Sequence, residues 1–151
     1  MFSRVYGVGK PLIIIHGLFG MSDNWNILGK KFAKIFNVHI LDLRNHGRSF
    51  HSNEFSYDFL SQDLHSYIKE NGLKNPIILG HSLGGKVAMH FCFNNIISVD
   101  RLIVVDIAPK RYEIDFHIKL LNILKDLPLA DFPNLKEIEV ELSKKIKDSA
   151  I

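Results

Sequence analysis

Two kinds of hydrophobic pattern alternate along the first two thirds of the chain. Short runs of consecutive apolar residues, rich in β-branched side chains, are typical of parallel strands that are buried on both faces. Such runs lie at residues 11–15, 38–43, 76–81 and 101–106. Between them, apolar residues recur at intervals of three or four, which predicts amphipathic helices. Strands that alternate with helices predict βαβ units, and hence an α/β fold with a mostly parallel sheet and helices on both faces.

Three helices are expected among these strands, and each has a predicted buried stripe. The stripes are Trp25, Leu28, Phe32 and Ile35; then Phe59, Leu60, Leu64, Tyr67 and Ile68 within residues 56–69; then Val87, Ala88, Phe91 and Cys92. Residues 2–9 predict a short strand and a glycine turn before the first parallel strand.

The pattern changes after Pro109. Residues 113–127 and 134–147 predict two helices with no strand between them, separated by Pro128 and Pro133. The sequence therefore predicts an α/β core over residues 1–110 and a helical segment over residues 111–151.

Composition narrows the class of protein. A chain of 151 residues with 46% hydrophobic residues is suited to one compact domain with a sizeable core. The net charge of +3 is modest, and the Lys144, Lys145 and Lys147 cluster is typical of a solvated helix face, so no nucleic-acid partner is expected. The single Cys92 is expected to be a buried small hydrophobe. No run approaches a signal peptide or a membrane span, which favours a cytoplasmic, reducing compartment.

Residues 80–84, at the end of the third strand, have the pattern Gly-x-Ser-x-Gly. A nucleophilic serine on a strand-to-helix turn needs neighbours without bulk, because the strand and the new helix nearly touch there. Gly80 and Gly84 meet this need, and Ser82 accepts a strained backbone to expose its hydroxyl. The following helix aims its N-terminal N–H groups at the centre where negative charge develops. The pattern predicts Ser82 as a nucleophile; the alternative is a glycine-rich turn that only packs a helix on a strand.

A carboxylate is expected beside Ser82. In an open parallel sheet, ligands collect at the carboxyl ends of the strands, and Asp106 ends the strand predicted to lie next to that of Ser82. There it can orient a histidine and stabilise the charged imidazole. Asp42, at the end of a more distant strand, is the second choice. The alternative role for Asp106 is to cap the turn before Pro109.

An oxyanion hole needs two backbone N–H groups. One is predicted to come from Leu83, directly after Ser82, and the other from the loop at residues 16–20, which contains Gly17. Leu18 is the first choice in this loop, and Phe19 is the second. A backbone donor does not depend on its side chain, and these apolar side chains are also suited to an acyl pocket.

The general base is the missing part of this prediction. In this architecture the catalytic order is Ser, Asp, His, and the only histidine after Asp106 is His117, in a predicted helix. His16 is expected to tether its own loop, and His81 to point to the other side of the strand from Ser82. The remaining histidines are expected to be solvated (His46, His51 and His65) or structural (His39 and His90).

No metal or cofactor is expected. The Cys and His residues lack ligand spacing, and the P-loop pattern is absent.

With these residues in place, the chain resembles the α/β-hydrolases, and among them the YbfF-type bacterial esterases and other abhydrolase-domain proteins. The matching segments are residues 16–20, 23–25, 42–49, 80–86 and 105–109, within a resemblance that covers residues 1 to about 112. The resemblance implies that Ser82 is the nucleophile and Asp106 the triad acid. It implies Leu18 and Leu83 as oxyanion donors, and short acyl esters or thioesters as substrates.

The chain departs from this family towards its C-terminus. Such proteins continue through a complete helical cap, two more strands and a last helix, and the triad histidine follows the final strand. Residues 111–151 resemble only the beginning of the cap, so His117 does not inherit that role. The expectation is a C-terminally incomplete α/β-hydrolase fold without its triad histidine.

Three hypotheses follow from this departure. The first is a serine esterase or acyl hydrolase whose 151-residue chain lacks its base; loss of one triad member leaves only binding and oxyanion stabilisation. The second is a catalytically inactive remnant or binding module. The third is a chain whose partner supplies the missing strands and base. A sheet that ends at residues 101–106 also predicts an exposed apolar edge and self-association.

Overall fold

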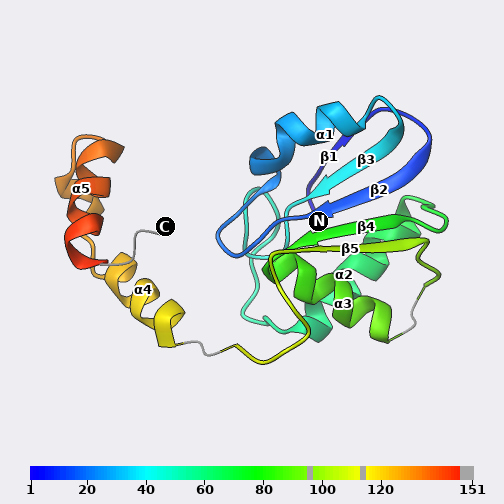
Figure 1. Cartoon of the computed structure of the whole chain (residues 1–151). Coiled ribbons are helices and arrows are strands. Elements are labelled where there is room, and N and C mark those ends of the chain that lie inside the picture. Colours follow the sequence, from blue (N-terminus) through cyan, green and yellow to red (C-terminus); the bar gives the residue numbers. More distant parts are fainter. Residues whose placement is uncertain (95–96, 113–114, 147–151) are drawn as a thin grey trace. The chain divides into compact units, whose positions relative to one another are not determined.

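A computed structural model of the chain describes residues 1–94, 97–112 and 115–146, without the side chains of residues 115–117, 119 and 120 (Figure 1). The chain divides into two compact units, Met1–Pro109 and Lys110–Ile151. Each unit is described by itself. Whether the second unit is the beginning of a helical cap stays a prediction.

The first unit is a five-stranded sheet with the strand order β1-β3-β2-β4-β5. Its strands are β1 (Ser3–Tyr6), β2 (Lys10–Ile15), β3 (Phe36–Leu41), β4 (Ile77–His81) and β5 (Arg101–Val105). β1 pairs antiparallel with β3, and every other pair in this sheet is parallel. The mostly parallel sheet expected from the sequence is therefore confirmed.

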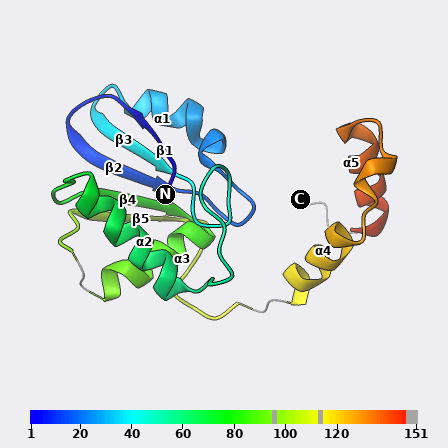
Figure 2. The same ribbon diagram turned by 180° about the vertical axis from the view of Figure 1, so that it is seen from behind.

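Helices cover both faces of this sheet (Figures 1 and 2). A 3-10 turn (Ser22–Trp25) and α1 (Asn26–Phe32) lie on one face, and α2 (Tyr57–Glu70) and α3 (Leu83–Phe93) lie on the other. In the central strand β2, the consecutive apolar residues Leu12–Ile15 are all buried, because both faces of the strand are covered. In β2, Ile13 and Ile15 join the core on the α2 and α3 side, whereas Leu12 and Ile14 join the core on the α1 side.

The predicted stripe of the first helix is only half correct. Trp25 and Phe32 are half-buried and pack against the core, but Leu28 and Ile35 are exposed. The buried position of α1 is Gly29, where an added Cβ would lie 2.5 Å from Cδ1 of Ile40. The helix backbone thus lies directly on the sheet, and its contact face is rotated away from the stripe that the apolar residues suggested.

The other two helices follow their predicted faces. α2 begins at the cap Ser56, whose side chain accepts a hydrogen bond from the Phe59 N–H, and it buries four of its five predicted apolar residues. α3 buries Val87, Ala88 and Phe91. Cys92 is half-buried, and burial raises the pKa of its thiol.

The cytoplasmic location expected from the sequence stays a prediction.

β5 is less buried than its hydrophobic run suggested. It pairs with β4 along one edge, and Leu102, Ile103 and Val105 are 37%, 42% and 36% exposed. The expectation of a strand buried on both faces is therefore wrong for β5, whereas the expectation of an exposed apolar edge agrees with these exposures.

The second unit contains helices and no strand in its described residues. These are α4 (Asp115–Lys125), a 3-10 turn (Leu129–Asp131) and α5 (Leu135–Lys145). The cap of α5 is Asn134, whose side chain accepts a hydrogen bond from the Glu137 N–H. Over the described parts of both units, no helix has the length and apolar character needed to cross a bilayer.

Candidate active site

The carboxyl ends of β2, β3, β4 and β5 lie at the same edge of the sheet because these strands are parallel. The loops that follow them carry the residues on which the functional prediction depends. Ser82 follows β4 and Asp106 follows β5, and these two strands are neighbours. β3, which precedes Asp42, is separated from β4 by β2.

Ser82 stands on a sharp turn between β4 and α3. Its backbone angles are φ 49° and ψ −113°, a conformation that L-residues adopt only under constraint. An added Cβ on Gly80 would overlap the Gly84 carbonyl, and one on Gly84 would overlap the carbonyls of Ile15 and His16. The two glycines of the motif are therefore required by the close approach of β4, α3 and the end of β2.

The two predicted N–H donors lie on either side of this turn. Leu83 is the first residue of α3, and Leu18 lies in a tight turn that the Gly20 N–H closes on the Gly17 carbonyl at 3.0 Å. A Cβ on Gly17 would lie 3.3 Å from the Ser82 Cβ, so this loop runs directly against the serine. Within the described part of the chain, the N–H groups of Leu18 and Leu83 make no hydrogen bond.

Asp106 follows β5 with a φ of 56°. The Ser82 N–H donates a hydrogen bond to the Val105 carbonyl at 3.0 Å, which ties the serine turn to the residue before Asp106. The Asp106 side chain is 84% exposed, and its Oδ2 lies 3.8 Å from Nε2 of His81. The carboxylate is thus accessible to a further group at the edge where Ser82 stands.

His81 lies closer to this edge than expected. Its ring packs near Trp25, with 6.2 Å between ring centroids, and Trp25 itself packs against the core on the α1 side. The strand alternation that places it there was predicted, but the ring also reaches both Gly17 and Asp106. His81 therefore belongs to the wall of the candidate site.

Asp42, the second choice for an acid, is a structural carboxylate. It is fully buried, and its two oxygens accept hydrogen bonds from the N–H groups of Ser22 and Arg48. Its side chain fills the space beside Gly47, where an added Cβ would overlap it. Asp42 thus joins the loop after β2 to the turn after β3.

His16 holds its own loop, as the sequence suggested. Its Nδ1 lies 2.7 Å from the Gly17 carbonyl, and its Nε2 accepts a hydrogen bond from the Leu43 N–H at 3.1 Å. Burial lowers the pKa of His16 below its ordinary value. Both ring nitrogens are occupied, so the ring is a neutral structural link.

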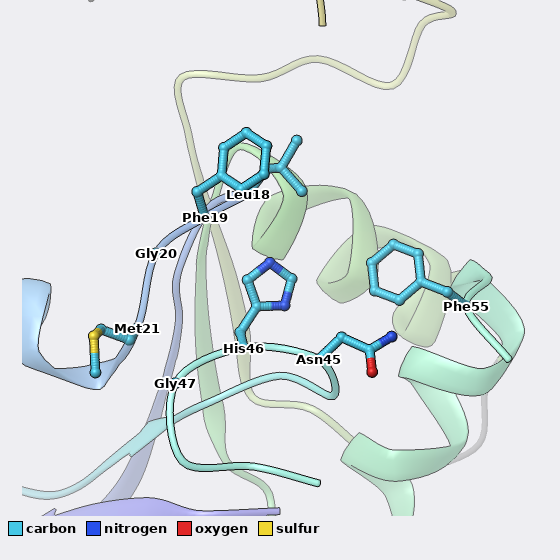
Figure 3. A pocket seen from close by; sticks show the side chains of 8 residues that line it. All are labelled: Leu18, Phe19, Gly20, Met21, Asn45, His46, Gly47 and Phe55. Atoms are coloured by element: carbon cyan, nitrogen blue, oxygen red, sulfur yellow. The ribbon is translucent and has the colours of Figure 1, made fainter. Parts of the chain in front are cut away.

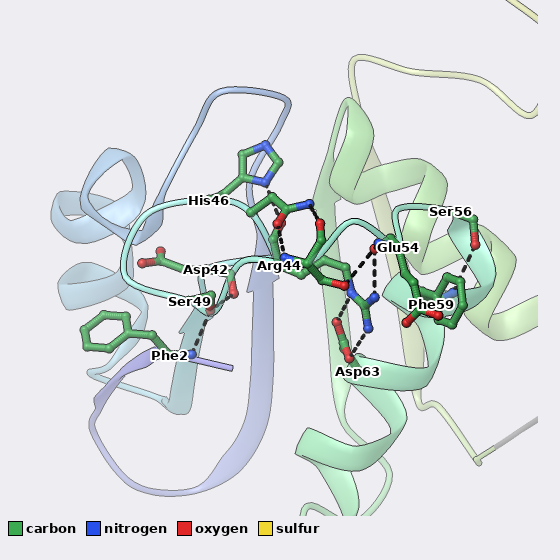
Figure 4. Close-up of polar contacts among 11 residues, drawn as sticks. Phe2, Asp42, Arg44, His46, Ser49, Glu54, Ser56, Phe59 and Asp63 are labelled. Atoms are coloured by element: carbon green, nitrogen blue, oxygen red, sulfur yellow. Dashed lines mark hydrogen bonds and ion pairs between the residues drawn. The ribbon is translucent and has the colours of Figure 1, made fainter.

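The turn after β3 is fixed to α2 by an ion pair. The Arg44 guanidinium donates two hydrogen bonds to Asp63, at 2.6 and 2.7 Å, and a third to the Glu54 carbonyl at 2.9 Å (Figure 4). Asp63 raises the pKa of Arg44, and the guanidinium lies over the Phe59 ring. These contacts of Arg44 therefore fix the backbone next to residue 46 to α2 and to the segment before it.

His46 is not solvated, which corrects the prediction from its polar surroundings. Only 9% of the residue is exposed, and its ring lies between the rings of His16 and Phe55, with centroids 5.1 and 6.2 Å away. Its Nδ1 lies 2.9 Å from the Arg44 carbonyl. The polar turn is folded over the sheet edge, and this burial was not visible in the local sequence.

No described histidine forms a hydrogen bond with Ser82. His39 is buried with its Nδ1 2.8 Å from the Tyr67 hydroxyl, and burial lowers its pKa. His90 pairs with Asp58 at 2.8 Å, and His51 is exposed. The side chain of His117 lies outside the described side chains, so its exclusion as the base stays a prediction.

Two pockets flank the loop that contains Leu18. One, of about 540 Å³, is lined by His16, Gly17, Leu18, Phe19, Gly20, Asn24, Trp25 and His81. The other, of about 430 Å³, is lined by Leu18, Phe19, Gly20, Met21, Asn45, His46, Gly47 and Phe55 (Figure 3). The first lies beside the Ser82 turn, and the second extends to the turn after β3.

The structure thus brings together Ser82, Leu83, Asp106 and the Leu18 loop at one edge. The sequence prediction missed His81 and His46 as residues of this edge. The available signal was their position, since each follows or ends a buried parallel strand. Among the described residues, no group of three His, Cys, Asp or Glu side chains is placed to hold a metal ion.

Comparison with known proteins places this site in a family context. A family model described as alpha/beta hydrolase fold matches residues 10–136. The solved structure of a marine microorganism esterase is similar over 97% of this chain and 59% of that chain, with 41% sequence identity and a TM-score of 0.89. The resemblance expected from the sequence motifs is confirmed.

Two relatives extend this comparison. The sn-1-specific diacylglycerol lipase ABHD11 of Danio rerio is 33% identical over 154 residues, which cover 96% of this chain and 48% of the lipase. Esterase YbfF of Escherichia coli is 32% identical over 110 residues, which cover 73% of this chain and 42% of the esterase. The chain therefore spans about half the length of the curated relatives it matches.

Proposed function

Because the chain belongs to the alpha/beta hydrolase fold family, we propose that it acts in the hydrolysis of carboxylic esters or thioesters through an acyl-enzyme on Ser82. The observation that carries this proposal is the Ser82 turn. A non-glycine residue at φ 49° stands at the start of α3, next to Gly17 and between two free N–H groups. Strain of this kind is retained where exposure of the side chain is needed.

The chemistry assigned to these residues has two steps. The Ser82 Oγ attacks the carbonyl carbon of the ester, and the developing oxyanion accepts hydrogen bonds from the N–H groups of Leu18 and Leu83. The tetrahedral intermediate then expels the alcohol or thiol, which takes up the proton that the Ser82 hydroxyl gave to the general base, and leaves the acyl group on Ser82. Water attacks this acyl-enzyme, releases the acid and regenerates the serine.

The observations support a triad acid more strongly than they support a general base. Asp106 is the proposed triad acid because it is exposed at the end of the neighbouring strand and can accept the N–H of an imidazole. The general base is proposed to be a histidine other than those of this chain, since no described histidine forms a hydrogen bond with the Ser82 Oγ and His117 is not expected to take that role. We therefore expect slow acylation of this chain and slow turnover.

A second candidate function is a binding module that holds an ester without turnover. The same observation favours it, because a serine without a base is a weak nucleophile. The Ser82 turn and the pockets would then serve recognition alone.

One experiment separates the two. The purified chain is incubated with 4-nitrophenyl butyrate, and covalent acylation is followed by intact-protein mass spectrometry together with release of nitrophenol. We expect a butyryl adduct that is absent in Ser82→Ala and retained in the control Ser66→Ala, which changes an exposed serine of α2. A folded chain with no Ser82-dependent adduct would favour the binding module.

We also propose that the chain self-associates through β5. An edge strand with exposed apolar side chains offers its unpaired backbone groups to another strand.

A further inference from the structure

The pocket between the Leu18 loop and the turn after β3 has one unusual polar group. Its walls are apolar at Leu18, Phe19, Met21 and Phe55, and the His46 ring lies between them (Figure 3). More than nine-tenths of His46 is buried. Its Nε2 atom keeps some exposure to the pocket, since it is not among the fully buried polar atoms without a partner. A ligand that covers this atom without a hydrogen bond would leave a polar group unsatisfied, which is costly.

The hydrogen bonds of His46 fix which nitrogen is free. A carbonyl oxygen can only accept, so the contact of 2.9 Å with the Arg44 carbonyl requires the proton on Nδ1. In the neutral ring, Nε2 then carries a lone pair and is an acceptor. Among the described residues, none donates to this nitrogen.

The ring is held in this orientation by the turn that carries it. The His46 N–H donates to the Leu43 carbonyl at 3.0 Å, and the His46 carbonyl accepts from the Ser49 N–H at 3.1 Å. The Asn45 side chain exchanges two hydrogen bonds with the backbone of Ser52. A fixed acceptor in an apolar pocket is suited to selecting a ligand, since little order is lost on binding.

We infer that this pocket is a specificity subsite for an uncharged ester whose apolar part carries a hydroxyl group, and that the hydroxyl donates a hydrogen bond to His46 Nε2. The inference rests on the proposed function for its ester. The loop of Leu18, Phe19 and Gly20 is a wall of both pockets. The Gly17 end of this loop lies against Ser82, and its other end lines the pocket of His46. We therefore place the reacting carbonyl at the Ser82 turn and the hydroxyl-bearing end beside His46.

The chemistry of the pocket selects this class of ligand. Phe19, Met21 and Phe55 favour an apolar chain over a charged one, because a charge there would lose its hydration. A donor on that chain gains the Nε2 acceptor of His46, to which no described residue donates. An isosteric ester without the hydroxyl leaves Nε2 unpaired and is expected to bind about five- to tenfold more weakly.

The test compares two esters that differ in one group. Binding of 4-hydroxybutyl butyrate and pentyl butyrate is measured by titration calorimetry on the Ser82→Ala chain, which prevents turnover. We expect the hydroxyl ester to bind about five- to tenfold more tightly. Equal affinities, or no measurable binding of either ester, would overturn the inference.

Two substitutions of His46 assign the preference to one nitrogen. The amide of His46→Gln can place an acceptor near the position of Nε2, whereas the shorter His46→Asn retains only a donor near Nδ1. We expect the preference to be lost in His46→Asn, partly kept in His46→Gln and unchanged in His51→Asn, an exposed control. A preference that survives in His46→Asn would contradict the assignment.

A measurement without substitution covers the case in which these variants do not fold. Long-range 1H–15N NMR spectra of the histidine rings report which nitrogen carries the proton. We expect the His46 Nε2 resonance to shift with the hydroxyl ester and to remain in place with pentyl butyrate. Unchanged resonances, or tighter binding of an ester ending in a carboxylate, would reject the acceptor role.

The binding test of the subsite and the acylation test of the proposed function can fail independently. Binding to Ser82→Ala does not require acylation, so a hydroxyl preference without any butyryl adduct would support the subsite and reject the hydrolase. An adduct on Ser82 without a hydroxyl preference would do the reverse.

Discussion

Four of the five non-glycine residues with positive φ in the described chain follow the four parallel strands. They are Phe19, Asn45, Ser82 and Asp106, with φ between 49° and 63°. Each position costs free energy in an L-residue, so its retention requires a stabilising environment. At the residue scale, the loops at this edge are therefore the strained part of a regular sheet.

The glycines beside these loops allow a direct test of close packing. Gly84→Ala would place a methyl group on the carbonyls of Ile15 and His16, and we expect it to lower the free energy of unfolding by about 2–3 kcal/mol. Gly72→Ala is the control, since Gly72 has φ 62° and no atom within 4 Å of an added Cβ. Only backbone strain, of about 1 kcal/mol, is expected there. Urea unfolding of both variants measures the difference, and equal losses would contradict the argument.

Buried histidines predict how stability depends on pH. Burial lowers the pKa of His16 below 6.5, so the unfolded chain takes up a proton at a higher pH than the folded chain does. The free energy of unfolding should therefore fall as the pH is lowered below about 6.5, by up to about 1.4 kcal/mol per pH unit for each such group. Urea unfolding between pH 7.5 and 5.5 measures this slope.

His39 contributes to this slope in the same direction, because burial also lowers its pKa. We expect His16→Asn to flatten the slope and the exposed control His51→Asn to leave it unchanged. An unaltered slope in His16→Asn would show that this ring does not cause the effect.

At the scale of elements, α2 connects the sheet to the turn after β3. The helix begins after Ser56, whose side chain accepts a hydrogen bond from the Phe59 N–H. Asp63, on the side of the helix, forms an ion pair with Arg44. Loss of a cap side chain typically costs about 1 kcal/mol. We expect Ser56→Ala to lower the free energy of unfolding by this amount.

The control for this prediction is Ser66→Ala on the exposed side of α2. Alanine is the better helix former, so this change should be neutral or slightly stabilising. Thermal unfolding followed by circular dichroism compares the two variants. A Ser56→Ala variant as stable as Ser66→Ala would show that the cap is dispensable.

At the scale of the whole molecule, the exposed edge predicts association. Ile103→Lys places a charge on β5, and charged side chains on edge strands oppose pairing between chains. We expect sedimentation velocity to show a smaller associated fraction for Ile103→Lys than for the unmodified chain. The same change at the exposed Ile27 of α1 should have little effect. Equal association of both variants would argue against β5 as the contact.

Several features could be predicted from local sequence because they depend on local physics. The strands were visible as apolar runs, the α2 face as a periodic stripe, and the Ser82 turn as a spacing of glycines. The stripe over α1 failed because Gly29, which has no apolar side chain, is the residue that packs on the sheet. The prediction that His46 is solvated failed for a similar reason. Its burial is set by Phe55 and His16, which are not its neighbours in the sequence.

The sequence by itself therefore determined the α/β class, the mostly parallel sheet, the family and the placement of Ser82 between a strand and a helix. These depend on periodicity and on glycine spacing, which are properties of neighbouring residues. Only the tertiary structure decided that Asp42 is a buried link, that His81 reaches Asp106 and that His46 faces a pocket. Those roles depend on which loops meet at the carboxyl edge, and the meeting is set by the strand order β1-β3-β2-β4-β5 rather than by any single segment.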